Sequence, residues 1–444
     1  MKLVLYRFLL WADYTFSLIK APVITFAVVV AVAFIHVFSL SANTCLAAEV
    51  NLPHLNVIYM AQAGYQPEHF REMTREFTRR YGIEVVLNIV RYDEEYMKIV
   101  TSATSPVATY DVVLVDLIWA AEFAKKKYVS PLDRGFVEKI RQDIPEIILD
   151  AFEYDGRIWA MPFLANIHFL FYNDDMLNGA GFSGPPETIE EMEAQMRALK
   201  KSGIVKYPMI ASWNQKEGLI CEYVWMVGAY GGELFDSAGE PVFHRGPGVT
   251  ALETMVRWVQ DGLVNPLSLT ADELLVKDVF ISGKAAFAPN WTFLNALMND
   301  LTVSQVAGKA RIGLLPVADS VRSATGRLSS SVSGFQGLAV MSNSSRKQEA
   351  WQYIEFITSP DMQGRFLQEV PVWVSLHASP EAKEKDPDID VKLKQLEWLH
   401  HRPKLVRYQE ISAIMQKFIH AALEGTMSPQ EALDIAADRA RRVH

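Results

Sequence analysis

The sequence LNVIYM at residues 55–60 decides the fold class, together with two apolar runs that follow it, VVLNIV at 85–90 and VVLV at 112–115. Between these runs, residues 68–81 carry apolar side chains at helical spacing among charges, and a shorter helix is expected at 94–101. Short strands that alternate with helices build a parallel sheet with helices on its faces. The sequence therefore predicts an α/β fold.

A second series of elements begins near residue 164. An amphipathic helix is expected at 189–200, strands return at 312–315 and 337–341, and helices are expected from there to the C-terminus. The Ser-rich stretch 322–333 is interpreted as a surface loop. A length of 444 residues is enough for two or three compact units.

The first 48 residues differ in composition from the rest of the chain. Three basic residues precede an apolar run at 21–40, and small residues follow that run up to Ala48. A basic segment, an apolar segment and a small-residue cleavage site in this order are typical of a secretory signal peptide. Because the apolar run nearly reaches the roughly 20 residues that span a bilayer, a retained membrane anchor is the alternative. Cleavage after Ala48 predicts a protein released into the periplasm.

The chain is acidic, with 43 Lys and Arg residues against 52 Asp and Glu residues and a net charge of −9. Nucleic-acid binders gain affinity from basic residues that neutralise phosphates, so no nucleic-acid partner is expected. Cleavage would leave Cys221 as the single cysteine, and an intramolecular disulfide would then be impossible. We expect a monomer.

The motifs of common catalytic sites are missing from the sequence: it has no GxSxG, HExxH or CxxC, and no phosphate-binding glycine loop. His400 and His401 are the one histidine pair, and adjacent residues point to different sides of a helix, so a shared metal is not expected. Glycosidase chemistry needs two carboxyls facing across a cleft. Asp174 and Asp175 are sequence neighbours and are expected at a helix start instead. We expect no catalytic residue, no metal and no cofactor.

Tryptophans supply the aromatic surface that a carbohydrate site needs, because sugars present flat C–H faces to rings and hydroxyls to carboxylates and amides. Trp258 and Trp351 stand in apolar helical patterns and are expected to pack in the core. Trp213, Trp291 and Trp373 stand beside polar residues in loop-like or strand-end contexts and are candidates for ligand contact. The ring of Trp291 is expected to project from a loop that follows a helix-like segment at 274–287.

Polar residues at the carboxyl ends of the expected strands form a second group of candidates. Ligands of open α/β sheets bind beyond these ends, where Asp116 and the loop at 62–66 are placed. Asp116 is predicted to accept hydrogen bonds from sugar hydroxyls. Asp116→Ala is expected to weaken binding about tenfold or more, with the stability of the empty protein nearly unchanged.

A series of short motifs in fixed order resembles the family 1 extracellular solute-binding proteins of ATP-driven importers. The resemblance covers nearly all of residues 55–442. It is carried by the strand end at 111–116, GRIWAMP at 156–162, LFYND at 170–174, FISGKAAFAPNW at 280–291, GFQGLAV at 334–340 and the C-terminal segment 403–434.

The resemblance implies two α/β lobes joined by crossover strands, with a solute bound between them and passed to the permease of an ABC transporter. It implies a first lobe of residues 49–163 and 309–343 and a second lobe of residues 164–308 and 344–444. A mono- or oligosaccharide is the expected solute. A polyol, a modified sugar or another solute is the alternative, and a periplasmic glycan-acting enzyme is a further one.

Within this family the sequence looks most like the trehalose/maltose-binding branch, on the strength of 115–119, 213–224 and Asn290-Trp291. It departs from that branch where Asn166 replaces an acidic residue, and where a late arginine that clamps sugar hydroxyls is replaced by Trp373 or missing. The residues expected to bind ligand are Gly64, Tyr65, Gln66, Asp116, Asn166, Trp213, Trp291, Phe293, Gly334, Phe335 and Trp373.

Overall fold

The computed structural model describes residues 54–61, 67–365, 370–377 and 379–443. The expected signal peptide at 1–48 and the expected ligand residues Gly64, Tyr65 and Gln66 lie outside the described residues. Among the residues that are described, no helix is long and apolar enough to cross a membrane.

The larger sheet is built from the three strands that the opening sequence predicts. β1 (His54–Met60) pairs in parallel with β2 (Glu84–Val90) and with β3 (Val112–Asp116). The α/β fold class is thereby confirmed. The prediction of a parallel sheet is correct for β1, β2 and β3 but not for the whole sheet, because β12 (Gln336–Met341) pairs antiparallel with β3. A strand that returns from a distant part of the chain has no direction fixed by local sequence.

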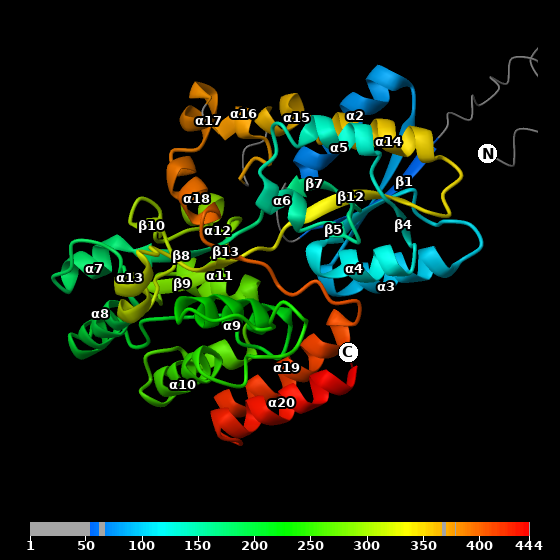
Figure 1. Ribbon diagram of the computed structural model, residues 1–444. Helices are drawn as coiled ribbons and strands as arrows, with labels where there is room; N and C mark the ends of the chain where they lie inside the picture. Colours follow the sequence, from blue (N-terminus) through cyan, green and yellow to red (C-terminus); the bar gives the residue numbers. More distant parts are fainter. Residues whose placement is uncertain (1–53, 62–66, 366–369, 378, 444) are drawn as a thin grey trace, which may run out of the picture. The chain divides into compact units, whose positions relative to one another are not determined.

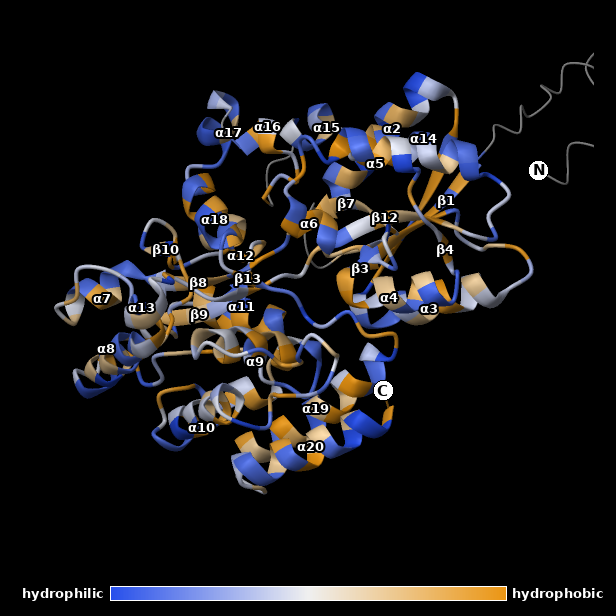
Figure 2. Cartoon of the chain, in the orientation of Figure 1, coloured by the Kyte–Doolittle hydropathy of each residue, from blue (hydrophilic) through white to orange (hydrophobic). Residues whose placement is uncertain are grey.

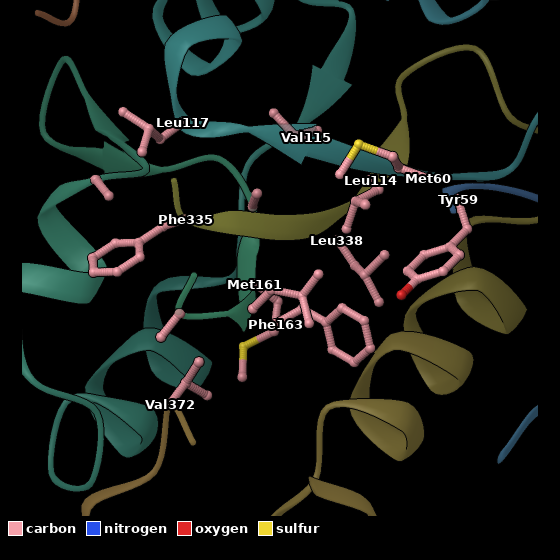
Figure 3. Close-up of a cluster of buried hydrophobic side chains, with 14 of the residues drawn as sticks. Tyr59, Met60, Leu114, Val115, Leu117, Met161, Phe163, Phe335, Leu338 and Val372 are labelled. Atoms are coloured by element: carbon pink, nitrogen blue, oxygen red, sulfur yellow. The ribbon is translucent and has the colours of Figure 1, made fainter. Parts of the chain in front are cut away.

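Two further strands complete this sheet on β12. β4 (Val129–Ser130) and β7 (Met161–Leu164) both pair antiparallel with it. Figure 3 shows the result, in which Leu114 of β3, Leu338 of β12 and Phe163 of β7 meet in one buried cluster with residues of β1.

Helices cover both faces of the larger sheet (Figure 1). α2 (Pro67–Tyr81) and α14 (Lys347–Ile357) lie on one face, and α3 (Tyr92–Thr104) and α4 (Leu117–Lys125) lie on the other. The apolar stripe of α2 is the one that its sequence pattern predicts, since Phe70, Met73 and Phe77 are buried there.

The smaller sheet has β8 (His168–Asn173) at its centre, antiparallel to β9 (Phe287–Trp291) and β10 (Ala310–Gly313). Its core continues into α9 (Glu217–Ala229), which is buried on nearly every side and accordingly apolar all round. Figure 2 shows the contrast with α20 (Pro429–Val443), which carries both hydrophobic and hydrophilic residues.

The remaining elements are short or peripheral. They are α5 (Arg134–Ile140), α6 (Glu146–Asp150), β5 (Glu153–Tyr154), β6 (Arg157–Ile158), α7 (Asp174–Gly179), α8 (Ile189–Lys201), α10 (Pro247–Gln260), η1 (Pro266–Thr270), α11 (Glu273–Ile281), α12 (Leu294–Met298), α13 (Asp319–Thr325), β11 (Ser331–Val332), α15 (Pro360–Arg365), α16 (Val374–His377), α17 (Pro380–Lys385), α18 (Ile389–Leu396), β13 (Leu399–His400) and α19 (Tyr408–Leu423).

Two local predictions were wrong. The segment after 341 is not wholly helical, because β13 pairs in parallel with β11. The Ser-rich stretch is not a surface loop either: Ser329, Ser330 and Ser331 are fully buried. Their hydroxyls donate to backbone carbonyls, and a serine satisfied in this way can be buried at little cost. Composition alone cannot show such partners.

The expected lobe bounds separate two elements from the sheets against which they pack. β10 falls in the expected first lobe, but it pairs with β8 in the smaller sheet. α14 falls in the expected second lobe, but it packs against α2 and β12. The division of the rest of the chain at 163/164 stays a prediction.

Stretches of chain run side by side where the two sheets meet. Residues 165–167 connect β7 to β8, residues 333–335 connect β11 to β12, and residues 399–402 lie beside them. The backbone N–H of Gly334 donates to the carbonyl of Asn166 at 2.9 Å, and that of Ser333 donates to the carbonyl of His400 at 3.1 Å. We refer to these three as the connecting stretches.

Candidate ligand-binding site

A cavity of about 360 Å³ lies at the connecting stretches and is lined from both sheets. The larger sheet contributes residues at the end of β3 and from α3 and α4. The smaller sheet contributes the end of β9 and the first turns of α9 and α11, and α19 adds polar residues.

Asp116 holds a fixed position at the end of β3. Its Oδ1 accepts from the backbone N–H of Ile118 at 3.2 Å and so caps α4, while its Oδ2 accepts from the hydroxyl of Tyr92 at 3.1 Å. Nη2 of Arg402 donates to the same carboxylate at 3.0 Å. The side chains of both Asp116 and Arg402 are almost wholly buried.

Arg402 joins this end of the larger sheet to the first turn of α9. Its Nη1 donates to Oε1 of Glu217 at 3.0 Å. The carboxylate of Glu217 also accepts from the hydroxyls of Tyr408 and Ser412, each at 2.5 Å. Burial opposes the charge of Arg402, but the neighbouring charges, Asp116 foremost, hold its pKa well above the ordinary value. Arg402 is therefore a fixed cation between two carboxylates.

Aromatic rings form the apolar walls. Trp291 packs edge-on against His168, with ring centroids 4.2 Å apart, and Tyr92 stacks on Trp119 at 5.7 Å. The close approach of the indole to a connecting stretch requires a glycine: a Cβ on Gly334 would lie 2.7 Å from Cζ3 of Trp291. The backbone thus sets the position of the ring.

Several buried polar atoms at the cavity have no partner among the described residues. Asn166 and Gln336 are 4% and 3% exposed, and their side-chain oxygens accept no hydrogen bond. The Nε of Arg402 is a donor in the same condition. Unpaired buried polar groups are costly, so these atoms mark places where a bound molecule could be held.

Two carboxyl groups stand on the helices of the opposite wall, Glu222 on α9 and Glu273 on α11. Glu222 is fully buried, and burial raises its pKa to about 8, although its carboxylate accepts from Nε1 of Trp225 at 2.6 Å. Glu273 lines the cavity, and burial also raises its pKa, against a hydrogen bond from Trp291. The charge of Glu273 is a further, smaller cause of the raised pKa of Glu222.

The structure brings five of the predicted ligand residues together around the cavity: Asp116, Asn166, Trp291, Phe293 and Gly334. Trp291 does not project from a loop as expected, however. The helix-like segment ends at Ile281, and Trp291 is the last residue of β9. Its contact with the cavity comes from the strand end.

Three predicted ligand residues are not among those that line the cavity. Trp213 is 1% exposed and packs in the core beneath α9. Phe335 is fully buried in the core of the larger sheet, and Trp373 packs there with its Nε1 donating to the carbonyl of Thr358 at 2.7 Å. Trp258 and Trp351 pack as predicted, against these same two cores.

Sequence reasoning missed Arg402, Glu217 and Glu273. From the family resemblance we expected the late arginine of the binding site to be replaced by Trp373 or to be missing. Arg402, however, is an arginine late in the chain that lines the cavity. The sequence feature that could have indicated Arg402 is its position between a histidine pair, which follows two apolar residues, and Pro403. That pair lies at a strand, not on a helix as expected: His400 ends β13, and Nδ1 of His401 is 2.6 Å from the hydroxyl of Ser333.

No group of three His, Cys, Asp or Glu residues within the described part of the chain is arranged to hold a metal ion. The residues that line the cavity offer hydrogen bonding, charge pairing and ring stacking.

Two α/β lobes with a cavity at the connecting stretches define a two-lobed solute-binding protein. The chain belongs to the bacterial extracellular solute-binding protein family, whose model matches residues 63–364. A "Probable amino-acid ABC transporter periplasmic-binding protein" of Sinorhizobium fredii is 24% identical over 389 residues, which are 84% of this chain and 85% of that one.

Solved structures show the same fold. Maltose-bound MalE3 of T. maritima superposes with a TM-score of 0.81 at 24% identity, over 88% of this chain and all of that one. A solute-binding protein of Agrobacterium radiobacter K84 in complex with ribitol superposes with a TM-score of 0.77 at 22% identity, over 88% of this chain and 99% of that one.

Proposed function

We propose that the chain is the substrate-binding component of an ABC importer and that it binds a polyhydroxylated solute, a sugar or a polyol, in the cavity. One observation carries the proposal: the ring of Trp291 stands in the same cavity as the Asp116–Arg402 pair and the unpaired oxygens of Asn166 and Gln336. A ring suits the C–H face of such a solute, and the polar groups suit its hydroxyls. The solutes named for the two solved relatives, maltose and ribitol, belong to this chemical class.

The position of these groups supports a receptor that closes on its ligand. A solute that contacts both Asp116 at the end of β3 and Trp291 at the end of β9 would bridge the two sheets. Such a ligand favours the arrangement in which both contacts are made, by as much as its affinities for the two arrangements differ. A micromolar dissociation constant corresponds to roughly −8 kcal/mol, and a few stacking and hydrogen-bonding contacts are enough for it.

The rest of the proposal concerns export, assembly and chemistry. The chain is released into the periplasm as a monomer after cleavage behind Ala48. It delivers its solute to the permease without changing the solute chemically. Mass spectrometry of the exported protein tests the cleavage, since an intact N-terminus in the membrane fraction would indicate the retained anchor. Chromatography of a bound oligosaccharide tests the absence of a reaction, since new products would reveal an enzyme.

A thermal-shift and calorimetric screen tests solute binding by residues 49–444. The panel contains maltose, trehalose, ribitol, mannitol and tagatose, and a ligand at 100 times its dissociation constant should add about 2.7 kcal/mol of stability. Trp291→Phe should reduce the affinity of every hit. Trp351→Phe is the matched control, because Trp351 packs against the core on α14 and does not line the cavity. The proposal fails if nothing in the panel binds, or if Trp291→Phe binds every hit unchanged.

A further inference from the structure

We propose that the solute carries a protonated amine, as an amino sugar or amino polyol does, and that Glu273 and the ring of Trp291 hold this amine. The inference rests on the proposed function and narrows it. It follows from which charges at the cavity are already paired, which hydrogen-bonding atoms are open, and where the aromatic rings stand.

The charges that line the cavity are unevenly matched. Arg402 is shared by Asp116 and Glu217, so its charge is fully used. Arg91 pairs with Asp93 at 3.3 Å, and both side chains are more than half exposed. Asp272, Glu273 and Lys216 also line the cavity. Within the described part of the chain, none of these three residues has an ion-pair partner.

Lys216 does not serve as the partner of Glu273. Its side chain is exposed and forms no ion pair with Glu273, although its positive charge acts to lower the pKa of that carboxyl. Asp272 is partly engaged as well, because its side chain accepts from the backbone N–H of Leu275 at 3.1 Å and caps α11. Glu273 remains as a half-buried carboxyl that lines the cavity without an ion-pair partner among the described residues.

The position of Glu273 is set by close packing. A Cβ on Gly218 would lie 2.6 Å from Oε1 of Glu273, so the carboxyl rests directly on the first turn of α9. The buried carboxyl of Glu222 is near Glu273 and, being a carboxyl, supplies no positive charge to pair with it. Trp291 lies close enough to Glu273 to lower the pKa of that carboxyl, so the indole ring and the carboxyl are neighbours in the cavity. A cation at this point would meet a carboxylate and an aromatic face together, as cation–π sites do.

The open hydrogen-bonding atoms match the same kind of ligand. The oxygens of Asn166 and Gln336, both nine-tenths buried or more, are acceptors without a donor. An ammonium group has three donors and no acceptor, and neighbouring hydroxyls supply more donors. The Nε of Arg402 and the Nε2 of Gln409 are open donors at the same cavity, and the hydroxyl oxygens of an amino sugar or amino polyol can accept from them.

The protonation of Glu273 gives the inference a second readout. Burial raises the pKa of this carboxyl, and Asp272 adds to the rise. A bound ammonium would favour the ionised form and lower the pKa again. Any proton that Glu273 holds in the free protein would then be released on binding, and two buffers of different ionisation enthalpy would show this release as a difference in the observed heat.

Calorimetry with matched pairs of ligands tests the inference on the full mature chain. The pairs are D-glucose with D-glucosamine and D-glucitol with 1-amino-1-deoxy-D-glucitol, each measured at pH 7 in two buffers. The amine of at least one pair should bind about tenfold or more tightly than its neutral partner. Glu273→Gln should abolish this preference, because the amide keeps the size of the side chain but cannot carry charge.

Asp278→Asn is the matched control, since Asp278 is an exposed carboxylate on the same helix that pairs with Lys277. It should leave the preference unchanged, and thermal melting should show that both variants are folded. If the neutral partners bind as tightly as the amines, or if Glu273→Gln keeps the preference, the amine inference is wrong and the proposed function stands. If no member of either pair binds and the sugar and polyol panel also fails, the proposed function is wrong with it.

Discussion

Arg402 donates a hydrogen bond to Asp116 at 3.0 Å, and the two side chains, 286 positions apart in the sequence, are 2% and 5% exposed. This pair overturns the expectation that Asp116 could be removed without a change in stability. Loss of the carboxylate would leave Arg402 with Glu217 alone, and would also remove the cap of α4 and the acceptor of Tyr92.

Asp116→Ala should therefore lower the free energy of unfolding by about 3–5 kcal/mol, the usual loss when one partner of a buried ion pair is removed. Ligand affinity should fall as well. Urea denaturation of the ligand-free protein measures the first effect, and calorimetry measures the second. Asp93→Ala is the control for stability: its exposed pair with Arg91 should contribute less than about 1 kcal/mol. An unchanged unfolding midpoint for Asp116→Ala would show that the pair does not stabilise the fold.

Trp291→Ala should affect folding and binding together. The ring is 8% exposed, packs against His168 and also lines the cavity. We expect a loss of about 3–5 kcal/mol in unfolding free energy from the space left in the core. We also expect a loss of about 1–3 kcal/mol in binding, by analogy with bases that stack on aromatic rings. Both quantities are measured on one variant, and full affinity despite a large loss of stability would remove Trp291 from the site.

Gly334→Ala should weaken binding while every ligand-contacting side chain is kept. The new methyl group would lie 2.7 Å from Cζ3 of Trp291, so the ring must move, at a strain of about 1–3 kcal/mol. Tryptophan fluorescence of the free protein should change, and affinity should fall. Gly184→Ala is the control, since a Cβ there meets nothing within 4 Å. Equal affinities for the two variants would indicate that the ring's position is unimportant.

Glu222 should make stability fall as the pH rises. Burial raises its pKa to about 8, whereas a carboxyl in an unfolded chain has a pKa of about 4.3. Between these pH values the folded protein keeps a proton that the unfolded chain has released, so stability declines with pH across that window. Glu222→Gln cannot ionise and should flatten the profile by a few kcal/mol, at roughly 1.4 kcal/mol per pKa unit.

Denaturation at pH 5, 6, 7 and 8 measures this difference. Glu84→Gln, which changes an exposed carboxyl on β2, should keep the profile of the parent chain. Parallel profiles for the parent and Glu222→Gln would mean that Glu222 ionises in the folded protein without penalty.

The first strands and the position of Asp116 could be predicted from local sequence, because an apolar run that ends in a carboxylate is recognised from adjacent residues alone. It was not enough for Arg402, whose partners lie in β3 and α9, more than 180 residues away in the sequence. It also could not separate Trp213 from Trp291. Both follow polar or turn residues, and only the packing of α9 over one and the cavity beside the other distinguishes them.

The connecting stretches also bear on how the protein can change over evolution. Asn166, Gly334 and Arg402 belong to the chain segments that join or border the two sheets, and they line the cavity as well. A substitution at any of them alters ligand contact and the linkage between lobes at once, so selection acts on both traits together. α3, which packs on β1, and α11, which packs on β9, line the cavity without belonging to these segments. New ligand preferences should therefore arise by drift and selection on those helices, while the connecting stretches vary little among descendants.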